Sequence, residues 1–424
     1  MSESALFPED QLGKDAILEL AARYVCPGRI DTFRMLGAVP VMGRREGHYF
    51  WDLDGRRLFD VHINGGTFSL GHRHPEIVAA LREGAGRYDI GNHHFPSGPR
   101  ARLAETLARL TPGDLQYTVF AASGSEANDV AIRAARRTTG RRRIISLIGS
   151  YHGHAGLGLA AGDRKTAEYF LSGGPADEFV QVPFNDLDAM QSALGEREVA
   201  AVILETIPAT YGFPLPAPGY LSGVRGLCDE HGSLLIADEV QTGLGRTGRM
   251  WAVDGYDVVP DILVVGKGLS GGVYPMAAAV LSPRAAAWLT DNAWGHVSTF
   301  GGSELGCHVA LKVFEILERP GVLENVRAMA ERLGQGLRDI AARQPFLSEV
   351  RQNGLVIGLK FAHELGGPMM TAACYEAGLW AFFAGFDRSV LQFKPDILVD
   401  GEACDELLER LEQAVTLCRT RYGL

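Results

Sequence analysis

The stretch DILVVGK (residues 261–267) is a short apolar run that ends on a lysine with a glycine on either side. Two earlier apolar runs also end on an ionisable residue: VAAVILE (199–205) on Glu205 and SLLIAD (233–238) on Asp238. The intervals between these ends are roughly 30 residues, the length of a strand–helix–strand unit. Short buried strands separated by helical stretches predict an α/β fold with a mostly parallel sheet.

The three strand-end residues Glu205, Asp238 and Lys267 are expected to meet. In open α/β sheets, ligands bind just outside the carboxyl ends of the strands. Any one of these residues alone could simply be the first residue after a buried strand that contacts solvent. Three together, with glycines clearing space around the lysine, favour a binding site.

A helix start further upstream offers a place for an anion. The segment FAASGSEAND (120–129) leads from a strand through Ser123, Gly124 and Ser125 into a helix, whose free N–H groups and dipole suit a phosphate. Ser123 and Glu126 also have the spacing of a capping box. The two roles are compatible, because a capped helix start keeps other donors free.

A strand-end lysine, a carboxylate and a phosphate cradle together fit pyridoxal phosphate. Lys267 would form the Schiff base, and Asp238 would keep the pyridine nitrogen protonated so that the ring accepts electrons. A nucleotide-binding P-loop is excluded, because Gly268 follows the lysine and Asp261 stands where the first glycine belongs.

Composition narrows the classes of partner. The 424 residues include 41 basic and 51 acidic side chains, a net charge of -10 that disfavours a nucleic-acid surface. No run approaches the roughly 18 apolar residues of a membrane span. The six cysteines lack a CxxC spacing, so neither a zinc site nor a disulfide framework is expected. Free cysteines fit a reducing compartment, so we expect a cytoplasmic location. The His72/His74 and His152/His154 pairs lack a nearby acid or thiol, so no metal is expected.

We expect two domains. Residues 1–64 form an N-terminal segment that belongs to a smaller domain, residues 65–305 form the large cofactor-binding domain, and residues 306–424 form the α+β remainder of the smaller domain. Within the first segment, Asp54-Gly55 between two aromatic-rich runs predicts a hairpin. The stretch 309–343 is expected to be helical.

The motifs together resemble the class III aminotransferases, which are pyridoxal-phosphate enzymes of fold type I. The resemblance rests on SGSEAND (123–129), YHGHAG (151–156), ADEVQTGLGRTG (237–248), PDILVVGKGLSGGVYP (260–275) and STFGGSELGC (298–307), and extends over roughly residues 35 to 424. It implies a homodimer with shared active sites and an amino transfer between an amine or amino acid and a keto acid or aldehyde, by a ping-pong mechanism.

The resemblance also implies a role for each matching residue. Lys267 corresponds to the Schiff-base lysine and Asp238 to the partner of the pyridine nitrogen. The other residues expected around the cofactor are the phosphate loop Ser123, Gly124 and Ser125, Tyr151 and Val240 on the two ring faces, Gln241 at the ring hydroxyl, Glu205 at its strand end, and Thr299 reaching the phosphate of the neighbouring subunit.

One segment departs from the family pattern. Many members carry an arginine near the C-terminus that binds the substrate carboxylate, and this chain reads SVLQFKPDILVD (389–400), with Gln392 in its place. Glu205 thereby loses its usual partner, and Lys394 or Arg388 would have to supply the cation. A racemase or epimerase, an aminomutase and a decarboxylase of the same fold therefore remain alternatives. A pyridoxal-phosphate-binding regulator would need an added DNA-binding module, which the sequence does not contain.

Overall fold

The central element of the computed structural model, which describes residues 12–91, 94–175, 177–196 and 198–424, is a seven-stranded sheet. The strands are parallel except β10, which is antiparallel to both of its neighbours. This confirms the predicted α/β class with a mostly parallel sheet. The strands lie in the order β4 (Tyr117–Ala121), β10 (Ala277–Leu281), β9 (Ile262–Val265), β8 (Leu234–Asp238), β7 (Val199–Glu205), β5 (Arg143–Leu147) and β6 (Phe179–Val182).

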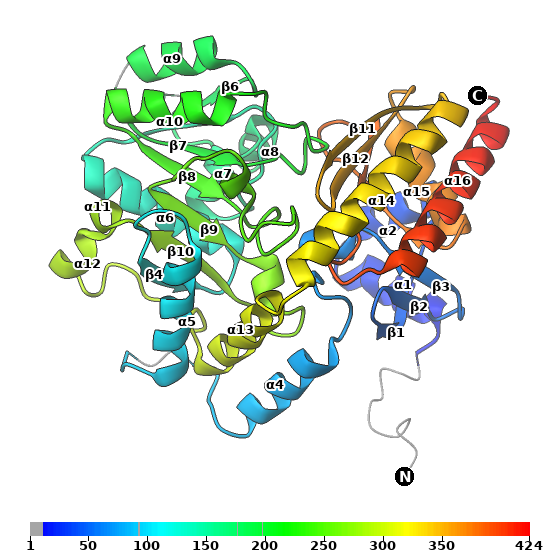
Figure 1. The fold of residues 1–424 in the computed structure, drawn as a ribbon, viewed down its shortest axis with the longest axis horizontal. Coiled ribbons are helices and arrows are strands. Elements are labelled where there is room, and N and C mark those ends of the chain that lie inside the picture. The colour runs from blue at the N-terminus through cyan, green and yellow to red at the C-terminus, as the bar shows by residue number, and fades with distance from the viewer. Residues whose placement is uncertain (1–11, 92–93, 176, 197) are drawn as a thin grey trace.

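The middle strands of this sheet are buried along their whole length, from β7 to β10. Their sequences are runs of Val, Ile, Leu and Ala, as expected for strands covered by helices on both faces. The helices of this part of the chain surround the sheet in Figure 1: α6 (Gly124–Thr139), α7 (Gly156–Ala161), α8 (Arg164–Tyr169), α9 (Leu187–Glu196), α10 (Tyr220–His231), α11 (Pro283–Ala286), α12 (Trp288–Asp291) and the 3-10 helix η3 (Ala252–Gly255).

The N-terminal part begins with two helices and the predicted hairpin. Strands β2 and β3 pair antiparallel on either side of Asp54-Gly55, which confirms the hairpin. The segment then crosses to the central sheet through three helices. In order, these elements are α1 (Lys14–Tyr24), α2 (Pro27–Leu36), β1 (Met42–Glu46), β2 (Tyr49–Asp52), β3 (Arg57–Asp60), α3 (Ile63–Gly66), α4 (Pro75–Ala85) and α5 (Gly98–Leu110). Residues 1–11 of the expected N-terminal segment lie outside the described residues.

The C-terminal part packs beside these N-terminal elements. The stretch 309–343 forms two helices rather than one, because Pro320 and Gly321, whose φ is +91°, interrupt it. Strand β13 pairs with β3, and β11, β12, β15 and β14 form a sheet of their own. The elements are α13 (Glu304–Leu317), α14 (Val322–Arg343), β11 (Leu347–Asn353), β12 (Val356–Phe361), α15 (Gly366–Glu376), β13 (Leu379–Trp380), β14 (Phe382–Phe383), β15 (Val390–Phe393) and α16 (Gly401–Tyr422).

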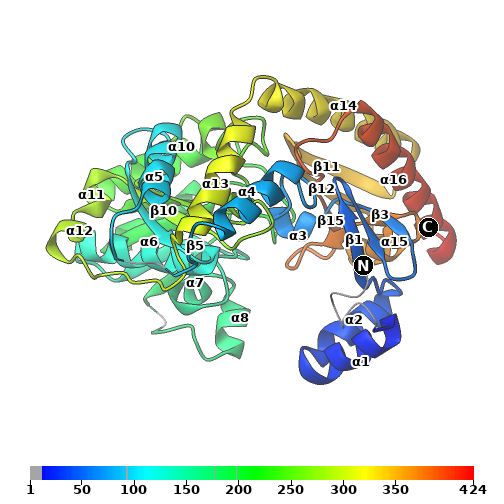
Figure 2. The ribbon, with the colours of Figure 1, turned by 90° about the horizontal axis from the view of Figure 1, so that it is seen from below.

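The N-terminal and C-terminal parts of the chain lie on the same side of the molecule. In Figures 1 and 2, the elements before α3 and those after α13 lie on one side of the molecule and the central sheet lies on the other. Helix α14 runs from the middle of the molecule along the C-terminal sheet. The domain boundaries at residues 64 and 305 stay a prediction.

Helices long and apolar enough to cross a membrane are not found among the described residues.

Candidate active site

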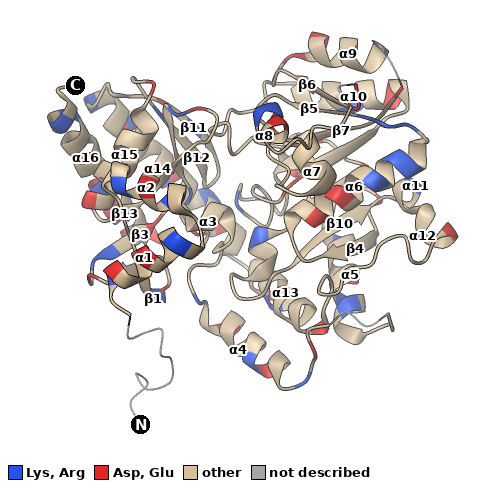
Figure 3. Ribbon diagram, turned by 180° about the vertical axis from the view of Figure 1, so that it is seen from behind, with Lys and Arg blue, Asp and Glu red and all other residues tan. Residues whose placement is uncertain are grey.

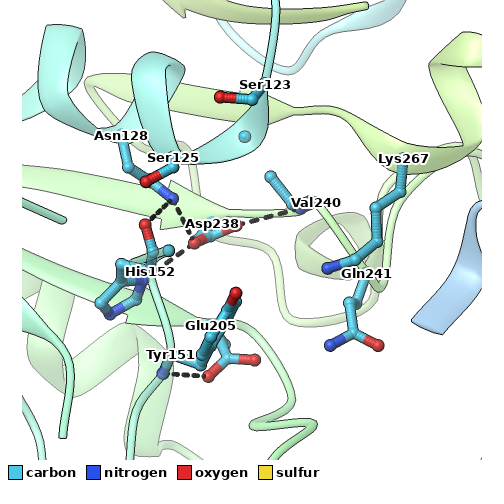
Figure 4. Close-up of a pocket in the computed structure, with 12 residues that line it drawn as sticks. Ser123, Ser125, Asn128, Tyr151, His152, Glu205, Asp238, Val240, Gln241 and Lys267 are labelled. Carbon is cyan, nitrogen blue, oxygen red and sulfur yellow. Dashed lines mark hydrogen bonds and ion pairs between the residues drawn. The ribbon is translucent and has the colours of Figure 1, made fainter. Parts of the chain in front are cut away.

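Three strand ends meet at one edge of the central sheet. Glu205 and Asp238 are direct register partners on β7 and β8, and Asp238 lies opposite Val264 on β9. Lys267 follows β9 and begins the short 3-10 helix η4 (Lys267–Ser270). All three line a cavity of about 220 Å³, shown in Figure 4, together with the start of α6. The structure thus brings together the residues that the sequence placed at three separate strand ends.

The backbone at Lys267 is in an uncommon conformation. Its φ is +44°, in the left-handed region, which costs a non-glycine residue roughly 1–2 kcal/mol. Gly268 allows the turn to pack closely, since a Cβ there would lie 3.2 Å from side-chain atoms of both Leu244 and Ser69. Figure 4 shows the Lys267 nitrogen pointing toward the space between Asp238 and Glu205. The tight turn therefore aims the lysine into the cavity.

Burial and charge act in opposite directions on this lysine. Burial lowers the pKa of Lys267, and the negative charges of Asp238 and Glu205 oppose that shift. The net effect is a lowered pKa, which increases the fraction of the nucleophilic free amine at neutral pH.

The buried carboxylate of Asp238 is held on three sides. Its Oδ2 accepts hydrogen bonds from Asn128 Nδ2 and His152 Nδ1, each at 2.8 Å, and its Oδ1 accepts from the Val240 N–H at 3.1 Å. Sequence reasoning missed Asn128 and His152 as part of the site. The signals were present, because Asn128 lies within SGSEAND and His152 within YHGHAG, but nothing local indicates that they meet Asp238.

Glu205 is also buried, and its partners are backbone donors. The carboxylate accepts from the N–H groups of Tyr151 and Ala209, each at 3.0 Å, so it is paired without an arginine. Burial raises the pKa of Glu205, with a contribution from Asp238. Burial likewise raises the pKa of Tyr151, whose ring centroid lies 6.0 Å from the Lys267 nitrogen.

The start of α6 is capped by Ser123, but the capping box is only half formed, because Glu126 accepts from Ala122 rather than from the Ser123 N–H. The Ser123 hydroxyl accepts from the Glu126 N–H at 3.2 Å, and the Glu126 carboxylate accepts from the Ala122 N–H at 2.8 Å. The Ser125 hydroxyl accepts from the Ala155 N–H at 3.1 Å. Ser123, Gly124 and Ser125 all line the cavity, so the N-terminus of α6 opens into it.

Of the other expected residues, Val240 and Gln241 line the same cavity, and Thr299 is exposed and outside that lining. Gln241 has a partner from the C-terminal part of the chain: its Oε1 accepts from Lys394 Nζ at 3.2 Å. Lys394 Nζ also donates to Gln392 Oε1 at 2.6 Å. At the segment that departs from the family pattern, Lys394 therefore donates hydrogen bonds to two glutamines, Gln241 and Gln392.

The cavity fits pyridoxal phosphate by its shape and its donor set. A Cβ at Gly124 would lie 3.1 Å from Val240 Cγ1, so any larger residue would crowd the helix start against the expected ring position. An amine, a fixed carboxylate and a helix N-terminus are the three groups that its aldehyde, ring nitrogen and phosphate require.

Metal ligation has no basis in the described residues, which contain no group of three or more His, Cys, Asp or Glu side chains able to hold an ion. His152 is bonded to Asp238, and His72 Nε2 lies 2.9 Å from Asp60 Oδ2.

Comparison with known proteins gives consistent matches over nearly the whole chain. Residues 36–415 match the family model described as aminotransferase class-III. The chain is 49% identical over 409 residues to an uncharacterized aminotransferase of Archaeoglobus fulgidus, covering 96% of each protein.

Solved structures of aminotransferases also match over most of their length. The chain aligns with the ornithine aminotransferase of Toxoplasma gondii at a TM-score of 0.88 and 25% identity, over 99% of both chains. It aligns with the taurine:2-oxoglutarate aminotransferase of Bifidobacterium kashiwanohense, solved with PLP and glutamate, at a TM-score of 0.85 and 28% identity, over 96% of this chain and 98% of that one.

Proposed function

The chain belongs to the class-III aminotransferases, and on that premise we propose that its amino transfer takes place in the cavity lined by Lys267 and Asp238. The enzyme uses pyridoxal phosphate to move an amino group between an amine or amino acid and a keto acid or aldehyde, in two half-reactions. The relatives named above are all aminotransferases, so the racemase, aminomutase and decarboxylase alternatives have no support.

The observation that carries this proposal is the meeting of Lys267, Asp238 and the start of α6 in one cavity. Bound pyridoxal phosphate supplies an aldehyde that carries the amino group and a ring that accepts electrons from the substrate carbon. In our assignment the cofactor would be held by Lys267 at its aldehyde, Asp238 at its ring nitrogen, Gln241 at its ring oxygen, Tyr151 and Val240 on its two faces, and Ser123, Gly124 and Ser125 at its phosphate.

The chain's own groups perform the remaining steps. Lys267 Nζ, with its lowered pKa, releases and accepts a proton at the substrate carbon. Asn128 and His152 fix Asp238 in one orientation, so that its charge stays opposite the ring nitrogen. Glu205, whose carboxylate accepts from the N–H groups of Tyr151 and Ala209, holds the Tyr151 backbone at the cavity wall.

Borohydride reduction of the yellow holoenzyme tests the lysine assignment. The cofactor should become fixed to the peptide that contains Lys267, and Lys267→Ala should abolish both the labelling and amino transfer. Lys165→Met, which removes an exposed lysine on α8, is the control and should label as the wild type does. Label on another peptide would contradict the assignment.

The structure has a second and larger cavity, of about 820 Å³. Its lining includes the rings of Phe33, Phe68, Trp380 and Phe382, together with Asn64. The next residue, Gly65, lies against Lys267 of the first cavity, since a Cβ there would lie 3.4 Å from Lys267 Cε. We assign this cavity to the body of the substrate.

The carboxylate that lines this second cavity is already engaged. Asp60 accepts from the N–H groups of His62 and Ile63 and lies beside His72, so it is not free to pair with a second ammonium group of a substrate. This lining also contains Arg29, Thr32 and His62. Its four aromatic rings and its lack of a free carboxylate favour an amine or amino acid with an apolar or aromatic body over a diamine.

Phe382→Ala and Phe383→Ala form a matched pair that tests this substrate class. The two rings stack at 4.5 Å, but only Phe382 lines the cavity. Phe382→Ala should raise KM for phenylalanine and 2-phenylethylamine by about tenfold, the usual effect of removing an apolar contact, and should leave KM for alanine nearly unchanged. Phe383→Ala should have little effect on any of them. Equal effects of the two substitutions would contradict the assignment.

A homodimer with shared active sites is also part of the proposal. The loop that follows α12 exposes Trp294, Val297 and Phe300 by 63%, 58% and 51%, and Thr299 lies among them. Large apolar side chains gathered on one exposed loop are typical of an interface. In the dimer, Thr299 would bind the phosphate in the neighbouring subunit.

We further propose a cytoplasmic location, because all six cysteines are unpaired.

A further inference from the structure

Lys394 is enclosed completely by the protein. It directly follows β15, is 0% exposed, and is tied by its backbone N–H to the Val61 carbonyl at 2.6 Å. It therefore sits where the C-terminal sheet meets the segment that follows β3. A lysine in such a place needs hydrogen-bond partners, since a buried polar group without them is costly.

The Lys394 amine has two acceptors, and both are glutamine carbonyls. It donates to Gln392 Oε1 at 2.6 Å and to Gln241 Oε1 at 3.2 Å, and the Phe213 ring centroid lies 5.1 Å away. No ion pair joins it to a carboxylate of the described residues. Its contacts are thus those of a hydrogen-bond donor rather than of one half of a salt bridge.

The charges around Lys394 agree with this. Burial lowers the pKa of Lys394 well below its ordinary value, and the positive charges of Arg246 and Lys267 lower it further, against Asp60 and Glu205. Two carbonyl acceptors match the two hydrogens of an uncharged amine.

The bond from Lys394 decides how Gln241 is presented to the cavity. With its carbonyl oxygen turned toward Lys394, the amide has its NH2 group, a donor of two hydrogen bonds, left to face a ligand. Figure 4 shows the amide nitrogen of Gln241 on the side of the cavity, below Lys267. The side chains of Gln241 and Lys267 both lie beside Gly65, since a Cβ there would lie 3.4 Å from Lys267 Cε and 3.7 Å from Gln241 Oε1.

We propose that Lys394 is a positioning residue that fixes Gln241 as a hydrogen-bond donor toward an oxygen of the bound cofactor. This rests on the proposed function, since it takes the cavity as the cofactor site. The proposal also gives a role to the residues that depart from the family pattern. Lys394, held by Gln392, forms a clamp on the cavity-lining residue Gln241 and does not present a cation to the substrate.

A double-mutant cycle on the apoenzyme tests the clamp. Lys394→Met removes the donor at similar volume and Gln241→Ala removes the residue on which it acts. Each should raise the pyridoxal-phosphate concentration needed for half-saturation by about tenfold, the upper range for one hydrogen bond, and should shift the pH midpoint of the bound cofactor's absorbance. The double mutant should be no worse than Gln241→Ala alone, because both substitutions break one relay. Additive losses, or a Lys394→Met protein that binds as the wild type does, would overturn the proposal.

Two further variants keep the result interpretable. Gln241→Glu keeps an acceptor for Lys394 but has no N–H to offer, so it should lose as much affinity as Gln241→Ala; wild-type affinity would refute the donor role. Lys165→Met controls for the loss of a lysine and should bind normally. If the wild-type protein itself binds no pyridoxal phosphate, the proposed function fails, whereas normal binding by the wild type with no loss in the variants refutes only the clamp.

Discussion

Lys267 and Lys394 are two lysines that the fold withdraws from water within one network. Burial lowers the pKa of both, and the positive charge of Lys267 adds to the effect on Lys394. Asp238 and Glu205 oppose the shift at Lys267, and Asp60 and Glu205 oppose it at Lys394, whose hydrogen-bond acceptors among the described residues are two glutamine carbonyls. A residue whose pKa is lower in the folded state than in the unfolded state gives stability a dependence on pH.

The sign of that dependence is predicted for Lys394. Between its lowered pKa and the ordinary value of about 10.4, the unfolded chain binds a proton at this lysine that the folded chain does not. Stability of the wild-type apoenzyme should therefore rise with pH across this window. Lys394→Met lacks this contribution. The thermal midpoint of the variant, relative to that of the wild type, should therefore be highest at low pH and should fall toward about pH 10.4. Lys165→Met should follow the wild-type curve, and a pH-independent gap for Lys394→Met would contradict the assignment of an uncharged amine.

At the scale of elements, the cavity depends on how closely the start of α6 approaches the loop after β5. Gly153 has a φ of +106°, and a Cβ there would lie 2.2 Å from Ser125 Oγ and 2.7 Å from Ser125 Cα. The second of these atoms is backbone, so the contact cannot be relieved by turning a side chain. The glycine lets the loop that carries His152 lie against the helix start.

Gly153→Ala should therefore separate the two elements. We expect a loss of at least about 2 kcal/mol in the free energy of unfolding, and weaker binding of pyridoxal phosphate, because the added methyl meets backbone at a strained φ. Urea unfolding of the apoenzyme and titration with the cofactor measure the two effects. Gly226→Ala is the control: it lies on α10 with no atom within 4 Å of the added Cβ, and should gain about 0.5–1 kcal/mol of stability. An unchanged Gly153→Ala protein would contradict this account.

Local patterns predict the middle of the central sheet well, because β7, β8 and β9 are buried along their length and each reads as an apolar run that leads to an ionisable residue. The ends alone were enough to indicate the positions of Glu205, Asp238 and Lys267. The antiparallel direction of β10 was not predicted, since AAAVL reads the same in either direction.

The supporting residues of the site could not be predicted in this way. Asn128, His152 and Lys394 act on groups 110, 86 and 153 residues away, and no short-range pattern encodes such a contact. Only the folded chain reveals that a lysine that follows the last strand reaches a glutamine that follows β8.

At the scale of the whole molecule, acidic and basic residues are interspersed along the ribbon in Figure 3, whereas large exposed apolar side chains gather on the loop after α12 and at the end of α8. If this loop forms the dimer interface, charges placed on it should separate the subunits. Trp294→Asp with Val297→Asp should convert the dimer into a monomer and abolish amino transfer, measured by light scattering and by activity. Tyr422→Asp, at an exposed position at the end of α16, should leave the oligomeric state unchanged. A double variant that remains dimeric would place the interface elsewhere.

The sequence separations of the cavity's hydrogen bonds have a consequence for the order of assembly. Asp238 is completed only when α6 and the loop after β5 reach β8, and Gln241 is completed only when β15 has docked against the loop that follows β8. Closing long stretches of chain is slow compared with forming a helix or a hairpin. During refolding, the yellow colour of bound pyridoxal phosphate should therefore develop after most of the helical signal has returned. A chain still on the ribosome, not yet extended to residue 394, would have its central sheet and its lysine but not the clamp on Gln241.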